Sequence, residues 1–225
     1  MEDNLSQALS NSISEETQSV AAELMEAGLD SVMDDGLLKE VPILSVAVSL
    51  YKIGHSIKER YYLRKLAAFI NALNKNVYNE EERNNYKRKI SDNPKQRDKE
   101  LEYILILIDR YIHSDKADKL AKLYLVYLDG KITWSMFSKY AEILDRLLPG
   151  DYEEMHTCSW PALNDSDVSD SLLRLISLGL VISHDKGATF GNTVGELALP
   201  DPVIKDYELT DFGIVFLRCL LGELD

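Results

Sequence analysis

The chain has 225 residues, of which 45% are hydrophobic and 28% are charged, and its formal net charge is −13. This length and composition are typical of a folded protein with one large or two small domains, and they exclude a collagen, an intrinsically disordered chain and a general polyanion binder. Two cysteines, Cys158 and Cys219, are too few for a disulfide framework, so we expect reduced thiols.

The first residues lack the basic and apolar segments of a signal peptide, and the chain has no run of about 18 apolar residues. The longest apolar stretch, residues 41–54, contains Ser45, Ser49 and Lys52, so it predicts a buried helix. We therefore expect a cytoplasmic protein, with peripheral attachment to a membrane as an alternative.

Apolar residues at helical spacing predict a bundle of about four helices over residues 13–112, after a frayed polar tail over residues 1–12. Ser12 and Glu15 form a capping-box pattern that begins the first helix. Pro42 begins a long helix that runs to about Lys75. In its second half, one group of residues is expected to face inward: Ile57, Tyr61, Leu66, Phe69, Ile70 and Leu73. A basic group is expected to face outward: Lys58, Arg60, Arg64 and Lys65.

Two further helices are predicted near residues 116–128 and 133–148, and the pattern changes after Gly150. The residues from Leu172 to Val181, and the later run Tyr207-Glu-Leu-Thr-Asp-Phe-Gly, resemble the back half of a winged-helix module. This resemblance implies a winged-helix-like module over residues 113–225 with a small β-hairpin, although the polar stretch 151–168 departs from a tight helix-turn-helix. The predicted fold class is therefore mainly α, with an N-terminal helical bundle and this C-terminal module.

Two other segments, Gly36-Leu-Leu-Lys-Glu-Val-Pro-Ile and Tyr124-Leu-Val-Tyr-Leu-Asp-Gly-Lys-Ile, resemble a family of small uncharacterised bacterial proteins. The family is associated with mobile elements or anti-phage loci. The resemblance implies no activity and no catalytic residue for this chain.

Charge is distributed unevenly along the sequence. Residues 1–35 carry −9, residues 36–150 carry +6 and residues 151–225 carry −10. Because DNA binding depends largely on Lys and Arg that neutralise phosphates, the acidic C-terminal part makes nucleic acid an unfavourable partner. A winged-helix module with this charge is better suited to protein contacts.

The basic stretch from Lys52 to Lys99 has a net charge of +7 and is the strongest candidate surface. It could receive an acidic protein surface, an anionic membrane or a nucleic acid backbone. It could also be a solvated helix face, or an internal partner of the acidic segments. We select these residues as candidates for binding a partner or an anionic surface: Lys58, Arg60, Arg64, Lys65 and, in the expected wing, Phe190.

Motifs for catalysis and metal binding are weak. His156 and Cys158 lack a second ligand pair at zinc spacing, and the acidic run near Asp165 lacks the Gly and Glu of an EF-hand loop. The sequence contains no Gly-x-Ser-x-Gly, Walker or His-Glu-x-x-His motif. We predict no enzyme, no catalytic residue, no metal site and no cofactor.

The sequence therefore favours a non-enzymatic protein-interaction component, such as an adaptor, immunity or defence-associated protein of a bacterial cytoplasm. A protein partner is expected, and a homo-oligomer is left open. One alternative is a membrane-perturbing defence effector that acts through the helix at residues 42–75. A second alternative is a winged-helix transcriptional regulator.

Overall fold

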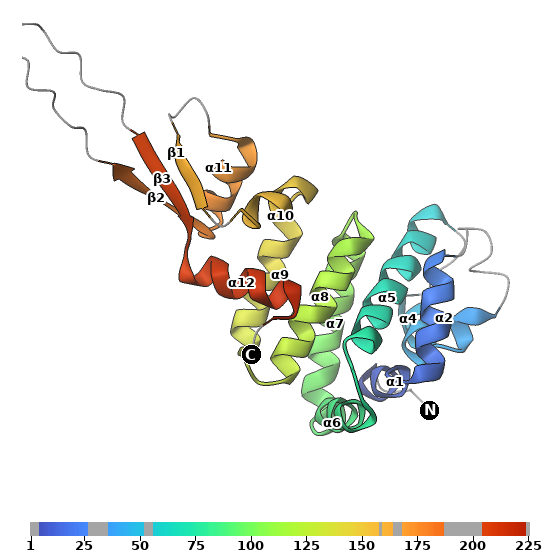
Figure 1. Cartoon of the computed structure of the whole chain (residues 1–225). Coiled ribbons are helices and arrows are strands. Elements are labelled where there is room, and N and C mark those ends of the chain that lie inside the picture. Colours follow the sequence, from blue (N-terminus) through green and yellow to red (C-terminus); the bar gives the residue numbers. More distant parts are fainter. Residues whose placement is uncertain are drawn as a thin grey trace, which may run out of the picture. The chain divides into compact units, whose positions relative to one another are not determined.

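A computed structural model describes residues 5–26, 36–51, 56–157, 159–163, 168–186 and 204–223. Helices dominate these residues and a small antiparallel sheet accompanies them (Figure 1), which confirms the mainly helical class. The chain forms two compact units, residues 1–145 with 220–225 and residues 146–219. The first unit thus extends beyond Ile112, where the sequence pattern placed the end of the bundle.

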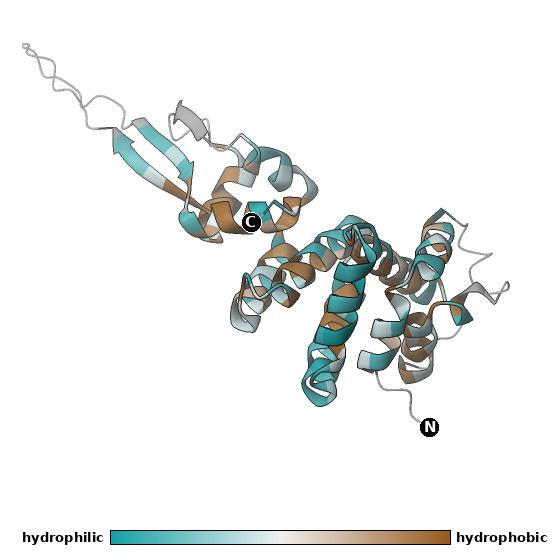
Figure 2. Cartoon of the chain, turned by 60° about the horizontal axis from the view of Figure 1, so that its bottom comes forward, coloured by the Kyte–Doolittle hydropathy of each residue, from teal (hydrophilic) through white to brown (hydrophobic). Residues whose placement is uncertain are grey.

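The first unit is helical throughout its described secondary structure. Its elements are α1 (Leu5–Ser12), α2 (Glu15–Glu26), the short 3-10 helix η1 (Leu37–Lys39), α4 (Pro42–Tyr51), α5 (Ile57–Lys75), α6 (Glu80–Ser91), α7 (Pro94–Arg110), α8 (Ser114–Leu128) and α9 (Trp134–Arg146). The helices show hydrophilic and hydrophobic sides in Figure 2, as the amphipathic spacing predicts. The most extensive contact between helices of this unit is between α5 and α8. There Tyr124 is fully buried, with its ring 6.3 Å from that of Phe69 and 5.9 Å from that of Phe137. Because α8 supplies the centre of this core, α8 and most of α9 belong to the first unit.

Residues 5–12 form a packed helix where a frayed tail was expected. Leu5 and Leu9 of α1 are buried. Ser12 is also buried, and its hydroxyl donates to the carbonyl of Ala8 at 2.8 Å and accepts the N–H of Ile43 at 3.0 Å. These contacts join α1 to α4, so this segment is part of the folded unit.

The single helix expected over residues 42–75 is two helices. Ser56 has an extended backbone, with φ −78° and ψ 155°, which ends any continuous helix at that position. Its hydroxyl accepts the N–H of Glu59 at 3.3 Å, and the Glu59 carboxylate accepts the N–H of Ser56 at 2.8 Å. This capping box begins α5, which is therefore a separate helix from α4 (Pro42–Tyr51).

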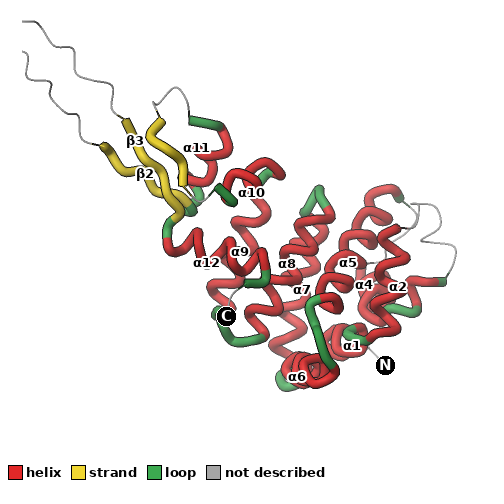
Figure 3. Tube along the Cα trace, viewed as in Figure 1, coloured by secondary structure: helices red, strands yellow, loops and turns green. Residues whose placement is uncertain are grey.

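The second unit contains the sheet. Its elements are α10 (Pro149–Met155), β1 (Ser159–Leu163), α11 (Asp170–Ser177), β2 (Val181–Lys186), β3 (Ile204–Leu209) and α12 (Asp211–Leu221), of which the residues to Cys219 belong to this unit. The antiparallel strands lie in the order β1-β3-β2 (Figure 3). Tyr207 and Leu209 of β3 are buried and Glu208 is exposed, as expected for a strand with one covered face. The sequence pattern predicted β2 and β3 but not β1.

The start of α12 lies against the residues that precede β2. Thr210 donates its hydroxyl to the carbonyl of Gly179 at 2.8 Å and accepts the N–H of Gly213 at 2.9 Å. A Cβ atom at Gly213 would be 2.2 Å from the carbonyl oxygen of Leu180. Glycine at this position therefore allows the backbone of α12 to approach Leu180 closely. Further along the helix, Cys219 is fully buried.

Candidate functional site

The four basic residues predicted to form one exposed face have different environments. Lys58 is exposed, and its Nζ lies 3.8 Å from a carboxylate oxygen of Asp109. Arg60 and Arg64 are half-buried. Lys65 is buried, which corrects its expected position on the outer surface.

The burial of Lys65 has a clear structural reason. Its ammonium donates to the carbonyl of Asp109 at 2.9 Å and to that of Tyr111 at 2.5 Å. These carbonyls lie at the C-terminal end of α7, where a helix leaves acceptors without intrahelical partners. Burial lowers the pKa of Lys65, and the nearby Asp109 partly offsets that effect. Lys65 therefore fastens α5 to the end of α7 and contributes little to an external surface.

Two apolar residues that were expected to face inward are on the outside of α5. Ile57 is 68% exposed and Tyr61 is 47% exposed, whereas Leu66 and Phe69, further along the same helix, are buried as predicted. Ile112, which follows the end of α7, is 84% exposed. A helical repeat indicates which residues share a face, but it does not indicate where the neighbouring helix stops covering that face.

These observations define a surface at the beginning of α5. An α-helix advances by about 100° per residue, which places Ile57 and Tyr61 between Arg60 and Arg64 on one side and Lys58 on the other. We call these five residues the α5 stripe. Phe190, the other residue proposed from the sequence, lies outside the described residues.

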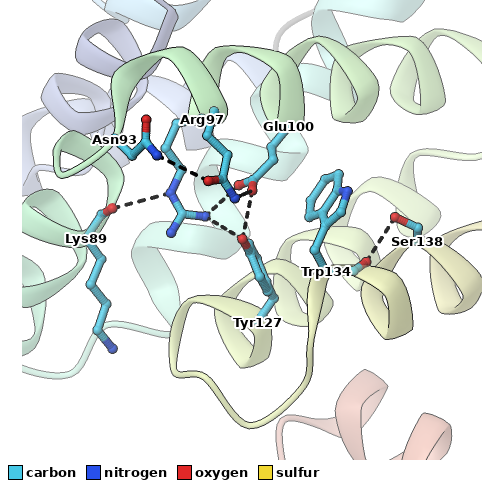
Figure 4. Close-up of polar contacts among 8 residues, drawn as sticks. Lys89, Asn93, Arg97, Glu100, Tyr127, Trp134 and Ser138 are labelled. Atoms are coloured by element: carbon cyan, nitrogen blue, oxygen red, sulfur yellow. Dashed lines mark hydrogen bonds and ion pairs between the residues drawn. The ribbon is translucent and has the colours of Figure 1, made fainter.

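A second candidate is a polar cluster between α7 and α8 (Figure 4). The Glu100 carboxylate is almost fully buried and accepts hydrogen bonds from Gln96 Nε2 at 2.9 Å, Tyr127 OH at 2.8 Å and Arg97 Nη1 at 2.5 Å. Arg97 also donates to Tyr127 OH at 2.9 Å, and burial together with the Glu100 hydrogen bond raises the pKa of Tyr127. Trp134 packs beside the cluster, its ring 5.3 Å from that of Tyr127.

The polar cluster has the features of a structural connection. Both oxygens of Glu100 are already hydrogen-bonded, and Arg97 additionally donates its Nε to the carbonyl of Lys89 at 3.3 Å. Buried polar groups in proteins are normally satisfied in this way. The cluster therefore links α6, α7 and α8.

A pocket of about 200 Å³ lies between α6 and α8, with Leu125 and Val126 among its lining residues. Its two carboxylates have internal partners. Glu82 accepts the N–H of Tyr78 at 2.9 Å, and an oxygen of Asp129 lies 3.7 Å from Lys89 Nζ. The pocket combines apolar and already paired charged groups, which does not indicate one class of ligand.

In the second unit, Arg174 of α11 forms an ion pair with a buried carboxylate. Arg174 donates Nε and Nη2 to the two oxygens of the buried Asp151 at 2.8 and 3.1 Å. Asp151 also accepts the N–H of Leu148 at 2.6 Å. Burial alone would raise the pKa of Asp151, but these hydrogen bonds lower it below the ordinary value. The pair joins α10 to α11.

No family model, curated protein or solved structure matches this chain. Among the residues that the structure describes, no helix has the length and apolar content needed to cross a membrane. The same residues bring together no group of three or more His, Cys, Asp or Glu side chains that could hold a metal ion.

Proposed function

We propose that this protein is a non-enzymatic interaction component that binds a partner protein through the α5 stripe. It would be an adaptor, immunity or defence-associated component of a bacterial cytoplasm. The observation that carries the proposal is the exposure of Ile57 and Tyr61 between cationic side chains.

The composition of the α5 stripe supports a protein contact. Tyrosine and arginine are enriched at protein interfaces and among the residues that contribute most to binding. Tyr61 offers an aromatic ring at low conformational cost, and Ile57 adds apolar area. Burial of such side chains against a partner would remove them from water, which favours association by roughly 25 cal/mol per Å² of apolar surface.

The charge of the whole chain favours a protein over an anionic membrane as the partner. A membrane is an extended surface, so its negative charge would act on the rest of a chain that carries −13. A protein segment can contact the stripe alone. The ten-residue α4 is apolar and Leu50 near its end is 57% exposed, so lipid binding is retained as an outcome of the test.

We further propose that the second unit is a winged-helix-like platform for protein contacts. The order α11, β2, β3, α12 and the Thr210 contacts at the start of α12 agree with that module. The pairing of Arg174 with Asp151 supports protein rather than DNA binding, because the cation of α11 already has a buried partner.

The proposal is tested with the tagged full chain in its natural host, after nuclease treatment, with soluble and membrane fractions analysed separately. Tyr61→Ser should remove a stoichiometric soluble partner, whereas Tyr78→Ser should retain it. Tyr78 is a matched control because it is 84% exposed and follows the opposite end of α5. A photo-cross-linking amino acid at position 57 should attach to the same partner.

Three other results would contradict the proposal. Recovery in the membrane fraction, with flotation on vesicles of anionic phospholipid, would favour a membrane-perturbing effector. A salt-sensitive electrophoretic shift of duplex DNA would favour a transcriptional regulator. A partner that binds equally to the wild type and to Tyr61→Ser would exclude the α5 stripe.

A further inference from the structure

Arg83 of α6 carries a buried donor that lacks an acceptor. Its side chain is half-buried, and its Nη1 is shielded from solvent without a hydrogen-bond partner among the described residues. Such a donor is unfavourable, because burial removes its contacts with water and the protein supplies no replacement. Buried polar groups are normally satisfied, so an exception of this kind points to a water, an ion or a ligand at that position.

A second cation, Lys87, lies one turn after Arg83 on the same side of α6. The interval of four residues brings two like charges together, which destabilises a helix. Lys87 is also half-buried, and within the described part of the chain neither cation forms an ion pair with a carboxylate. By contrast, Lys89 on another side of the helix lies 3.7 Å from Asp129. Positive charge is therefore uncompensated at Arg83 and Lys87.

The neighbouring residues do not neutralise this pair of cations. Helical spacing places Glu80 one turn before Arg83, but Glu80 is exposed and the two form no ion pair. Helix α1 packs against α6 on the side of Lys87. There the Ser10 hydroxyl donates to the carbonyl of Lys87 and accepts the hydroxyl of Ser91, each at 3.5 Å. Because α1 contains no charged residue, it brings hydroxyl and amide groups to this side of α6 and no carboxylate.

We infer that Arg83 and Lys87 bind an oxyanion of the phosphate type. The guanidinium presents parallel N–H donors that match two oxygens of a phosphate, and the ammonium adds a second charge. Two cations match the nearly double negative charge of a phosphate group better than the single charge of a carboxylate. The anion supplies the acceptor that Arg83 Nη1 lacks and reduces the repulsion between the two side chains. This site lies on a different helix from the α5 stripe and does not depend on the proposed function.

The test titrates the full-length protein with inorganic phosphate at pH 8 and constant ionic strength, and isothermal titration calorimetry measures binding. We expect saturation at one phosphate per chain. Arg83→Met should weaken binding at least tenfold and Lys87→Met at least threefold, because each removes one cation and keeps an apolar stem. Lys139→Met is the matched control and should leave the affinity unchanged, since Lys139 is an exposed lysine of α9.

Stability provides an independent readout. Without phosphate, Arg83→Met should be at least as stable as wild type, since it removes an unpaired buried donor and the repulsion with Lys87. Phosphate at a tenfold excess over its dissociation constant should raise the urea midpoints of wild type and Lys139→Met. The midpoint of Arg83→Met should rise less. Circular dichroism establishes that each variant is folded.

Two results overturn the inference. One is phosphate binding that does not saturate or that is equal in wild type and Arg83→Met. The other is a lower urea midpoint for phosphate-free Arg83→Met than for wild type, which would give Arg83 a purely structural role. Methyl phosphate separates the two sources of the oxyanion. Tighter binding of methyl phosphate than of inorganic phosphate identifies a phosphate monoester as the ligand, and the reverse order identifies free phosphate.

Discussion

Lys65 illustrates what a single residue contributes beyond its charge. Its position in a basic cluster predicts exposure, yet its ammonium takes the place of solvent or a capping residue at the end of α7. The long apolar stem of lysine allows this, since it can pass along a hydrophobic surface before the charged group reaches its acceptors.

At this scale we predict that Lys65→Met lowers the free energy of unfolding by about 1–3 kcal/mol. The substitution keeps the apolar stem but leaves the carbonyls of Asp109 and Tyr111 without their buried donor. Urea unfolding followed by circular dichroism measures the change. Lys58→Met is the matched control and should leave the midpoint unchanged, because Lys58 is 80% exposed. Equal midpoints for both variants would show that the two hydrogen bonds contribute nothing to stability.

At the scale of the element, Ser56 begins a helix and Gly213 permits a close backbone contact, and hydrophobic periodicity alone reveals neither. The apolar pattern continues from Pro42 to Lys75, so it favours one long helix. The Ser-x-x-Glu signature of Ser56 and Glu59 was present in the sequence and could have identified the second start. The close approach at Gly213 has no comparable local signal, because it depends on the distant residue Leu180.

We predict opposite effects for two glycine substitutions in the second unit. Gly213→Ala should destabilise this unit by about 2 kcal/mol or more, since the new Cβ would overlap a backbone carbonyl that cannot simply rotate away. Gly150→Ala should be neutral or stabilising, because its Cβ would lie 3.8 Å from Ser171 Oγ and alanine favours a helix. Thermal unfolding of both variants provides the comparison. A Gly213→Ala protein as stable as wild type would contradict the close approach.

At the scale of the whole molecule, part of the basic stretch is paired inside the first unit. Lys58 lies 3.8 Å from a carboxylate oxygen of Asp109, and Lys89 lies 3.7 Å from one of Asp129. Arg97 is hydrogen-bonded to the buried Glu100. These cations of the sequence's basic stretch therefore have acidic partners within the same unit.

Tyrosine burial predicts how the stability of the molecule changes at alkaline pH. Burial and the neighbouring Glu142 raise the pKa of Tyr103 from 10.0 to about 12, and burial likewise raises the pKa of Tyr86 and Tyr124. Above pH 10 the unfolded chain loses these protons more readily than the folded chain, so stability should fall as the pH rises through 10 toward 12. Urea unfolding at pH 9 and pH 11 measures this loss.

Tyr103→Phe isolates one contribution to that loss. The variant should lose less stability than wild type between pH 9 and pH 11, whereas the exposed control Tyr78→Phe should behave as wild type. An identical loss in wild type and Tyr103→Phe would contradict the raised pKa of Tyr103.

The sequence predicted the helical class, most helices and the β2–β3 pair, because these depend on local periodicity and capping. It also proposed basic residues at the beginning of α5 as a candidate surface, and that role stays a prediction. The sequence predicted that Tyr61 is buried and Lys65 exposed, whereas Tyr61 is exposed and Lys65 is buried. The burial of Lys65 depends on where α7 ends, and that position is set by another segment of the chain. The winged-helix likeness and the interaction function stay predictions.

Because Cys219 of α12 is buried, the rate at which its thiol is alkylated reports how often this part of the protein opens. A thiolate must be accessible to react with an alkylating reagent, so Cys219 can react only after the surrounding packing has separated. In a chain carrying Cys158→Ser, the ratio between its labelling rate in the unfolded and folded states would give the free energy of that opening. The same labelling experiment on Gly213→Ala would show whether a steric clash near the start of α12 increases local opening at Cys219, near its end.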